Sequence, residues 1–101
     1  MKLWLDDTRD PTKLGFTDFV WVKTVEEAIY ILETQKVNFA SLDHDLGFMT
    51  KSGYDVILHM ENNNIWPPEG VHVHSMNPVG RAKMEAAIKK HYGRNFDPKF
   101  D

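Results

Sequence analysis

The apolar residues of this chain fall into short runs that end in polar residues, and four of these runs have the pattern of β-strands. They are rich in β-branched and aromatic residues, which favour an extended backbone. The four runs cover residues 2–5, 19–22, 37–42 and 71–75. We therefore predict four strands, spread over most of the chain.

Three helices are predicted between and after these strands, because residues that cap helix N-termini stand at suitable positions. Thr24 begins the first helix, and Glu27, three residues later, completes a capping box. Ser52 begins the second helix, which continues to about residue 62. Asn77 begins the third, and Pro78 takes the first helical position, where its missing N–H costs nothing.

Each predicted helix buries one apolar face, with residues repeating at intervals of three and four positions. The third helix should stop at Gly93, a left-handed C-cap. The residues that we expect to be buried are, in chain order, Val25, Ala28, Ile29, Leu32, Tyr54, Ile57, Leu58, Met84, Ala87 and Ile88.

The connections between these elements also carry information. Residues 8–18 contain Pro11 and Gly15 and have no helical period, so we expect a loop there. Residues 62–70 contain Pro67 and Pro68, which neither a helix nor a central strand would tolerate. Strands therefore alternate with helices after the second strand, a pattern typical of a parallel α/β sheet with right-handed crossovers.

Acidic residues follow two of the predicted strands. Asp6 and Asp7 follow the first, and Asp43, His44 and Asp45 follow the third. Ligands of open parallel sheets bind beyond the carboxyl ends of the strands, so these clusters should meet at one rim. Converging carboxylates repel one another unless a cation or a proton is bound, and oxygen ligands favour Mg²⁺ or Mn²⁺. Alternatively, each Asp is an ordinary turn or cap residue.

The start of the third helix lies at the same rim and is a candidate phosphate site. Its backbone N–H groups and dipole attract anions, Gly80 would allow close approach, and Arg81 could clamp a phosphate through two hydrogen bonds. Ser75 and Asn77 lie beside it, and Arg9 could bind an anion or pair with the acidic residues before it. The alternative is a capped helix with a surface arginine.

Two histidines of the fourth strand, His72 and His74, alternate and so share one face of the sheet. We expect His72 to be solvated. His74 is a possible site residue, and if it or His44 were a ligand, the metal preference would move toward Mn²⁺, Zn²⁺ or Fe²⁺.

Composition narrows these possibilities. The chain has 101 residues, which we interpret as one domain with a core over about 2–92 and a tail at 93–101. It lacks Cys, which excludes disulfides, thiolate metal sites and Cys nucleophiles. No apolar run approaches membrane-spanning length, so we expect a cytoplasmic protein. The net charge of −3 and the lack of a basic stripe argue against binding of long nucleic acid.

Four stretches, "LDDTRDP", "SLDHDLG", "SGYDV" and "VHSMNPVGRAKM", resemble the cyclic-phosphate-processing receiver-like (cREC) family, which is related to the receiver domains of response regulators. The resemblance runs from about residue 3 to residue 88. It implies a short, receiver-like (flavodoxin-like) three-layer fold with a mostly parallel sheet of about four strands and flanking helices.

The resemblance also implies roles for individual residues. In receiver domains an acidic pair and a third-strand Asp bind Mg²⁺, and these correspond here to Asp6, Asp7 and Asp43. The third-strand Asp accepts a phosphoryl group in receivers, and Ser75 corresponds to the hydroxyl residue that contacts it. Receivers also carry a phosphate-contacting Lys on a fifth strand. We find no equivalent, because Lys99 does not lie in a predicted strand.

The activity that the resemblance implies is metal-dependent hydrolysis of a cyclic phosphate, in a nucleotide or in ADP-ribose, during RNA repair or processing. His44 is the candidate general acid or base, because imidazole exchanges protons near neutral pH. Asp45 would orient His44 or bind metal, and Asp43 would bind metal or attack phosphorus directly. Two alternatives remain: a non-catalytic module that binds a metal, a nucleotide or a protein, and a phosphorylatable receiver. The oligomeric state is left open.

Overall fold

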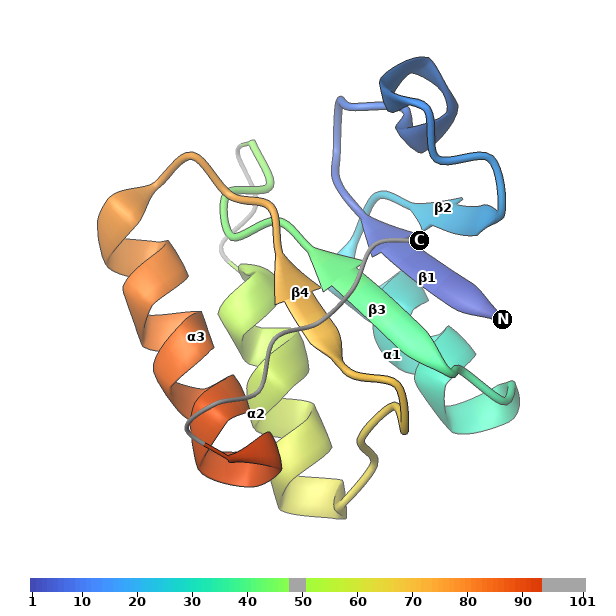
Figure 1. The fold of residues 1–101 in the computed structure, drawn as a ribbon. Helices are drawn as coiled ribbons and strands as arrows, with labels where there is room; N and C mark the ends of the chain where they lie inside the picture. Colours follow the sequence, from blue (N-terminus) through green and yellow to red (C-terminus); the bar gives the residue numbers. More distant parts are fainter. Residues whose placement is uncertain (48–50, 94–101) are drawn as a thin grey trace.

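A computed structural model describes residues 1–47 and 51–93 of the chain, and its centre is a four-stranded parallel sheet (Figure 1). The strands are β1 (Lys2–Leu5), β2 (Phe19–Val22), β3 (Phe39–Leu42) and β4 (Val71–Val73). Their order across the sheet is β2-β1-β3-β4. The predicted parallel α/β sheet is therefore confirmed.

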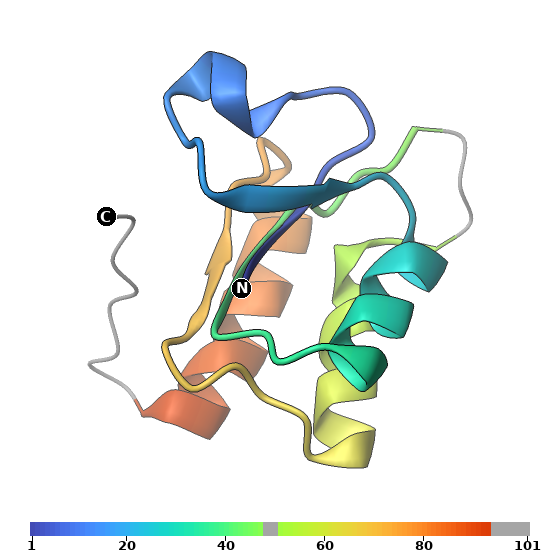
Figure 2. The same cartoon turned by 90° about the vertical axis from the view of Figure 1, so that its right-hand side faces the viewer.

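Three α-helices form one layer against a single face of the sheet, as Figure 2 shows most clearly. They are α1 (Val25–Thr34), α2 (Gly53–Asn63) and α3 (Pro78–Tyr92). Alternate strand residues point into this layer, because side chains of a strand alternate between its two faces. The core that results combines apolar strand residues with the buried residues of all three helices, including Leu3, Leu5, Ala28, Leu42, Ile57, Val73 and Met84.

The opposite face of the sheet carries aromatic residues instead of a second helical layer. The connection from β1 to β2 is a loop with one short 3₁₀ helix, η1 (Pro11–Leu14), where we predicted a loop without helix. This loop packs on the sheet through Phe16, whose ring lies 5.8 Å from that of Trp4. Within the described residues, the third layer that the sequence interpretation expected is therefore absent.

Several element boundaries differ from the prediction. β3 begins at residue 39 instead of 37, and β4 ends at residue 73 instead of 75. After β4 the backbone N–H of His74 still donates to the Leu42 carbonyl, but the Ser75 hydroxyl then accepts from the Asn77 N–H and turns the chain toward α3. The helix ends at residue 92 as predicted, although Gly93 is extended with positive φ (φ 115°, ψ 159°) and is not in the left-handed helical conformation.

The caps of the first two helices also need correction. Glu27 accepts from the Lys23 N–H and from the Thr24 hydroxyl, so it does not return to the Thr24 N–H as a capping box requires. The second helix has the full box instead, because the Ser52 N–H donates to Asp55 Oδ2 at 2.8 Å. This box fixes the start of α2 directly beside the end of β3.

The buried face of α2 is rotated relative to the predicted one, because α2 packs between α1 and α3. Leu58 and Tyr54 are only partly buried, whereas Val56, Ile57 and Met60 are fully buried. On the neighbouring helices, Ile29 and Ala87 are likewise partly buried. No helix in residues 1–47 and 51–93 is long and apolar enough to cross a membrane.

Candidate functional site

Of the four carboxylates expected at one rim of the sheet, those of Asp6, Asp7 and Asp43 converge there, whereas Asp45 is exposed and does not belong to this group. The strand order places β1 and β3 side by side, with β2 and β4 on their outer sides, so the chain leaves these two strands in opposite directions. Such a switch point is where open parallel sheets bind ligands. Asp6, Asp7 and Asp43 each place one carboxylate oxygen there, and these oxygens lie within 4.8 Å of one another.

Asp6 is the member of this group with the most hydrogen bonds, and its side chain is fully buried. Its Oδ1 accepts from the backbone N–H groups of Thr8 and Arg9, both at 2.9 Å. Its Oδ2 accepts from Arg9 Nε at 2.8 Å. Burial alone raises the pKa of a carboxyl group, but these hydrogen bonds and the Arg9 charge together lower the pKa of Asp6 below its usual value.

The Arg9 guanidinium lies between the two buried carboxylates. Besides its bond to Asp6, its Nη2 atom lies 3.4 Å from Asp43 Oδ2 and donates to the His74 carbonyl at 3.1 Å. The sequence interpretation left two roles open for Arg9, anion binding and pairing with the acidic residues before it. The structure shows that it pairs with Asp6 and, more distantly, with Asp43.

The negative charge of Asp43 is less well compensated by hydrogen bonds and by positive charge than that of Asp6, although the residue as a whole is only 6% exposed. Burial and the neighbouring Asp6 charge raise its pKa above the usual value, and the Arg9 charge and the bonds from the His44 N–H and the Ser75 hydroxyl offset only part of this. A positive ligand would therefore stabilise the Asp43 carboxylate, because it would oppose both causes of the shift.

His74 supports Asp6 on the face of the sheet that points away from the helices. Its Nε2 lies 3.1 Å from Asp6 Oδ2, its Nδ1 lies 2.7 Å from the Ser41 hydroxyl, and its ring stacks on Trp4 at 3.9 Å. Burial lowers the pKa of His74 to about 4, so it is neutral at pH 7. A neutral ring that donates from Nε2 to Asp6 and accepts at Nδ1 from Ser41 satisfies both contacts.

Ser41 was not predicted as a site residue. It is a fully buried hydroxyl in an otherwise apolar strand, and it lies in register with Trp4 of β1. The alternation of strand side chains places Trp4, Ser41 and His74 on one face, which was the available signal.

His44 and Asp45 form a second group beside the carboxylates. His44 Nδ1 lies 2.8 Å from Asp45 Oδ1, which also accepts from Asn77 Nδ2 at 3.2 Å. These two bonds lower the pKa of Asp45 below its usual value. The His44 ring packs so closely on Gly80 of α3 that a Cβ there would lie 2.4 Å from the ring. Asp45 and Gly80 therefore hold the His44 imidazole in one orientation, while the His44 backbone N–H donates to Asp43 Oδ1 at 2.8 Å.

The start of α3 differs from the predicted phosphate site. Asn77 Oδ1 accepts from the N–H groups of both Val79 and Gly80, and Pro78 has no N–H. These first helical donors are thus already bonded within the protein. Arg81 points its Nε toward Glu85 at 3.5 Å, a pair along the helix surface.

The donor set fits a hard divalent ion, because three carboxylate oxygens converge without sulfur or imidazole. Gly47 provides room beside them. With φ of +64° it adopts a conformation that other residues rarely take, and a Cβ at this position would lie 2.8 Å from Asp7 Oδ2. Asp6, Asp7 and Asp43 are the residues that would hold such an ion.

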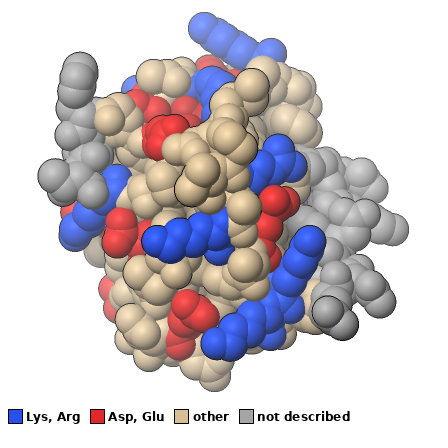
Figure 3. Space-filling model, turned by 90° about the vertical axis from the view of Figure 1, so that its left-hand side faces the viewer, with Lys and Arg blue, Asp and Glu red and all other residues tan. Residues whose placement is uncertain are grey.

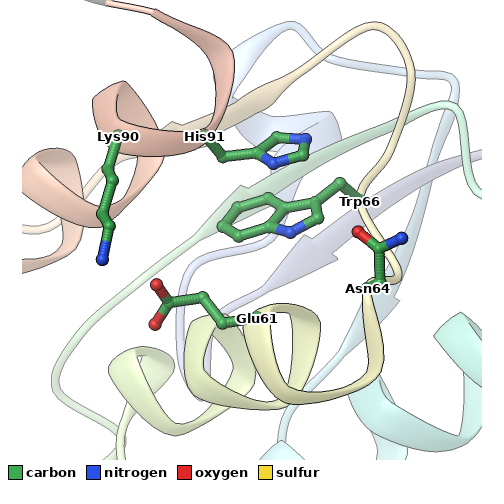
Figure 4. Close-up of a pocket in the computed structure, with 5 residues that line it drawn as sticks. All are labelled: Glu61, Asn64, Trp66, Lys90 and His91. Atoms are coloured by element: carbon green, nitrogen blue, oxygen red, sulfur yellow. The ribbon is translucent and has the colours of Figure 1, made fainter.

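A pocket separate from the carboxylate group lies at the C-terminal ends of α2 and α3. It is lined by Glu61, Asn64, Trp66, Lys90 and His91 (Figure 4). Trp66 and His91 stack with ring centroids 4.2 Å apart, and the adjacent Tyr92 hydroxyl donates to the Pro67 carbonyl at 2.6 Å. These contacts fasten the connection before β4 to the end of α3.

The charges over α3 are mixed in sign. Figure 3 shows Lys and Arg side chains interspersed with Asp and Glu on this face. The basic residues of the helix are Arg81, Lys83, Lys89 and Lys90, of which Arg81 pairs with Glu85 and Lys83 lies over the Tyr54 ring. Lys99, which the sequence interpretation did not accept as the equivalent of the receiver lysine, lies outside the described residues, as does the tail from residue 94.

Comparison with known proteins places this geometry in a family. A family model described as "Cyclic-phosphate processing Receiver domain" matches residues 1–90. Among solved structures, the signal receiver domain of a protein assigned as a Luxo repressor from Vibrio parahaemolyticus matches with a TM-score of 0.64. It shares 23% identity, and the match covers 85% of this chain and 70% of that one, which establishes a receiver-like fold. A search of curated proteins gave no match.

Proposed function

We propose that this chain is a metal-dependent phosphoesterase which opens a cyclic phosphate, in a nucleotide or in ADP-ribose, during RNA repair or processing. The chain belongs to the cyclic-phosphate processing receiver domain family, whose model matches residues 1–90. The observation that carries the proposal is the convergence of Asp6, Asp7 and Asp43 at the switch point of the sheet. His44 and Asp45, held beside them, add a group that can transfer protons.

Opening the ring requires that water form a new bond to phosphorus, that one ring P–O bond break, and that the leaving oxygen receive a proton. A bound Mg²⁺ or Mn²⁺ would neutralise charge on the phosphoryl oxygens and make water a better nucleophile. The three carboxylates would hold this ion, and Arg9, whose side chain is 36% exposed, would bind a further phosphate oxygen through its guanidinium.

Proton transfer falls to His44. Its Nδ1 is bonded to Asp45, which fixes the ring orientation and favours a proton on that nitrogen. Nε2 is then the atom that takes a proton from water or gives one to the leaving oxygen. Asn77 holds Asp45 in place, while Gly80 allows the ring to lie against α3.

An alternative route uses Asp43 as the nucleophile, which would produce an aspartyl phosphate that water then hydrolyses. Rapid acid quenching during turnover, followed by borohydride reduction, distinguishes the routes. Reduction of an acyl phosphate at Asp43 converts this residue to homoserine, whereas direct attack by water leaves Asp43 unchanged.

A second candidate function is a non-catalytic binding module. It is favoured by the way in which the protein itself neutralises the acidic group, since Asp6 accepts four hydrogen bonds from Thr8, Arg9 and His74 at 3.1 Å or less. Such a module would bind a metal ion, a nucleotide or a protein without turning over a cyclic phosphate, and replacement of His44 by Ala would leave its binding unchanged.

The test is a turnover assay on a small panel that includes a nucleoside 2′,3′-cyclic phosphate and ADP-ribose 1″,2″-cyclic phosphate. Reactions are followed by ³¹P NMR with Mg²⁺, with Mn²⁺ and with EDTA. Ring opening that stops with EDTA supports the phosphoesterase. Ion binding without turnover across the panel supports the binding module, and phosphorylation of Asp43 by acetyl phosphate would indicate the phosphorylatable receiver.

A further inference from the structure

Arg9 competes for the same carboxylate oxygens that a divalent ion needs. Its Nε atom contacts Asp6 Oδ2 at 2.8 Å, and its Nη2 atom lies 3.4 Å from Asp43 Oδ2. Both carboxylates belong to the group whose oxygens converge within 4.8 Å. A guanidinium and a divalent ion cannot both approach Asp43 Oδ2 closely without strong like-charge repulsion.

The two ends of the Arg9 contact differ in strength. The bond to Asp6 has the length of a charge-assisted hydrogen bond, about 2.7–2.9 Å. At 3.4 Å, the approach to Asp43 is longer than an ordinary N–H···O bond. When another cation arrives, the contact with Asp43 is therefore the one that gives way.

The backbone at Arg9 is fixed, so any movement is confined to its side chain. Its N–H donates to Asp6 Oδ1, and its carbonyl accepts from Trp4 Nε1, both at 2.9 Å. The Arg9 side chain is 36% exposed, whereas the side chain of Asp6 is fully buried and that of Asp43 is 9% exposed. To turn toward solvent while Nε stays on Asp6, the Nη2 end gives up its bond to the His74 carbonyl, at 3.1 Å, as well as the contact with Asp43.

We infer that Arg9 and a divalent ion are alternative counter-ions of Asp43, so that ion binding releases the Nη2 end of Arg9 and turns it toward an incoming phosphate. Arg9 would then couple the binding of the two ligands, because it weakens binding of the divalent ion and strengthens binding of the phosphate. The inference rests on the ion site of the proposed function.

The coupling predicts shifts of opposite sign when Arg9 is replaced. In Arg9→Met, Mn²⁺ should bind about 10-fold more tightly, because a positive charge beside the ion is removed. Inorganic phosphate should bind the Mn²⁺-loaded protein about 10-fold more weakly, because the guanidinium contact is lost. If the role of Arg9 were purely structural, Arg9→Met would weaken the binding of both ligands.

The experiment uses the whole chain and measures Mn²⁺ affinity by water-proton relaxation and phosphate affinity by calorimetry. Arg81→Met is the matched control, because Arg81 pairs with Glu85 on the α3 surface, and both affinities should stay within about twofold of wild type. An Arg9→Met affinity for Mn²⁺ equal to or weaker than that of wild type would overturn the coupling. If neither the wild-type protein nor Arg9→Met binds Mn²⁺, the ion site of the proposed function is refuted as well.

A second measurement needs no variant. In ¹⁵N-labelled wild-type protein, addition of Mg²⁺ should change the Nη signals of Arg9, while its Nε–H stays protected from exchange by Asp6. Binding of Mg²⁺ without any change in the Arg9 signals would contradict the inference even if Arg9→Met failed to fold.

Discussion

The contact between His44 and Gly80 offers a perturbation whose size can be worked out from the structure. An alanine Cβ at residue 80 would lie 2.4 Å from His44 Cγ, 2.5 Å from Cδ2 and 2.6 Å from Nδ1. An ordinary van der Waals contact begins at 3.4 Å, so the ring must move by about 1 Å. The backbone of His44 cannot follow easily, because its carbonyl accepts from the Gly53 N–H at 3.1 Å.

Two effects oppose each other in Gly80→Ala. Replacing glycine by alanine inside a helix stabilises it by about 1 kcal/mol. Overpacking a buried contact costs about 1–3 kcal/mol. We expect overpacking to win, with a net loss of about 1 kcal/mol, since Cγ is the ring atom nearest the backbone and moves least freely. A 1 Å displacement of the imidazole should lower kcat/KM by about 100-fold.

Urea unfolding and cyclic-phosphate turnover measure these two effects separately. Ala86→Gly, at an exposed position of α3, calibrates the helix contribution without touching His44. The ring signals of His44 in ¹H–¹⁵N spectra report its bond to Asp45 in both variants. A Gly80→Ala protein that gains about 1 kcal/mol of stability, with unchanged His44 signals and turnover, would refute the role given to this contact.

Two predictions concern stability and pH. Because the pKa of Asp43 is raised in the folded state, its ionisation above pH 3.8 destabilises the fold. Asp43→Asn removes this charge and should therefore raise the Tm measured by calorimetry at pH 7. A lower Tm would contradict this. The folded-state pKa of His74, about 4, lies below its unfolded value of 6.5, so stability should fall as pH drops from 6.5 to 4, by on the order of 2–3 kcal/mol. In urea unfolding at pH 7 and pH 4.5, His74→Gln should lack most of this dependence, and an unchanged slope would exclude His74 as its source.

The sheet and the meeting of the acidic residues could be predicted from sequence because each depends on local patterns plus one topological rule. Short apolar runs marked the strands, and cap residues such as Ser52 and Asn77 marked the helix starts. Carboxyl ends of parallel strands share a rim, which was sufficient to bring Asp6, Asp7 and Asp43 together.

The remaining features depend on long-range packing that local patterns do not contain. The pairing of Arg9 with Asp43 spans two strands, and the contact of His74 with Asp6 requires the positions of β1 and β4 relative to each other. At the start of α3, Asn77 was predicted as a cap, yet the same prediction left the helix N–H groups free for phosphate. A side-chain cap uses those donors itself, so the two expectations were incompatible.

Turnover of a nucleoside 2′,3′-cyclic phosphate by matched Asp→Asn variants tests the central claim most directly. Asp43 belongs to the carboxylate group, whereas Asp18 is an exposed residue that pairs with Lys2. With Mn²⁺ present, the account predicts that Asp43→Asn loses about 100-fold or more of kcat/KM, while Asp18→Asn keeps the wild-type value. Wild-type turnover by a folded Asp43→Asn protein would contradict it.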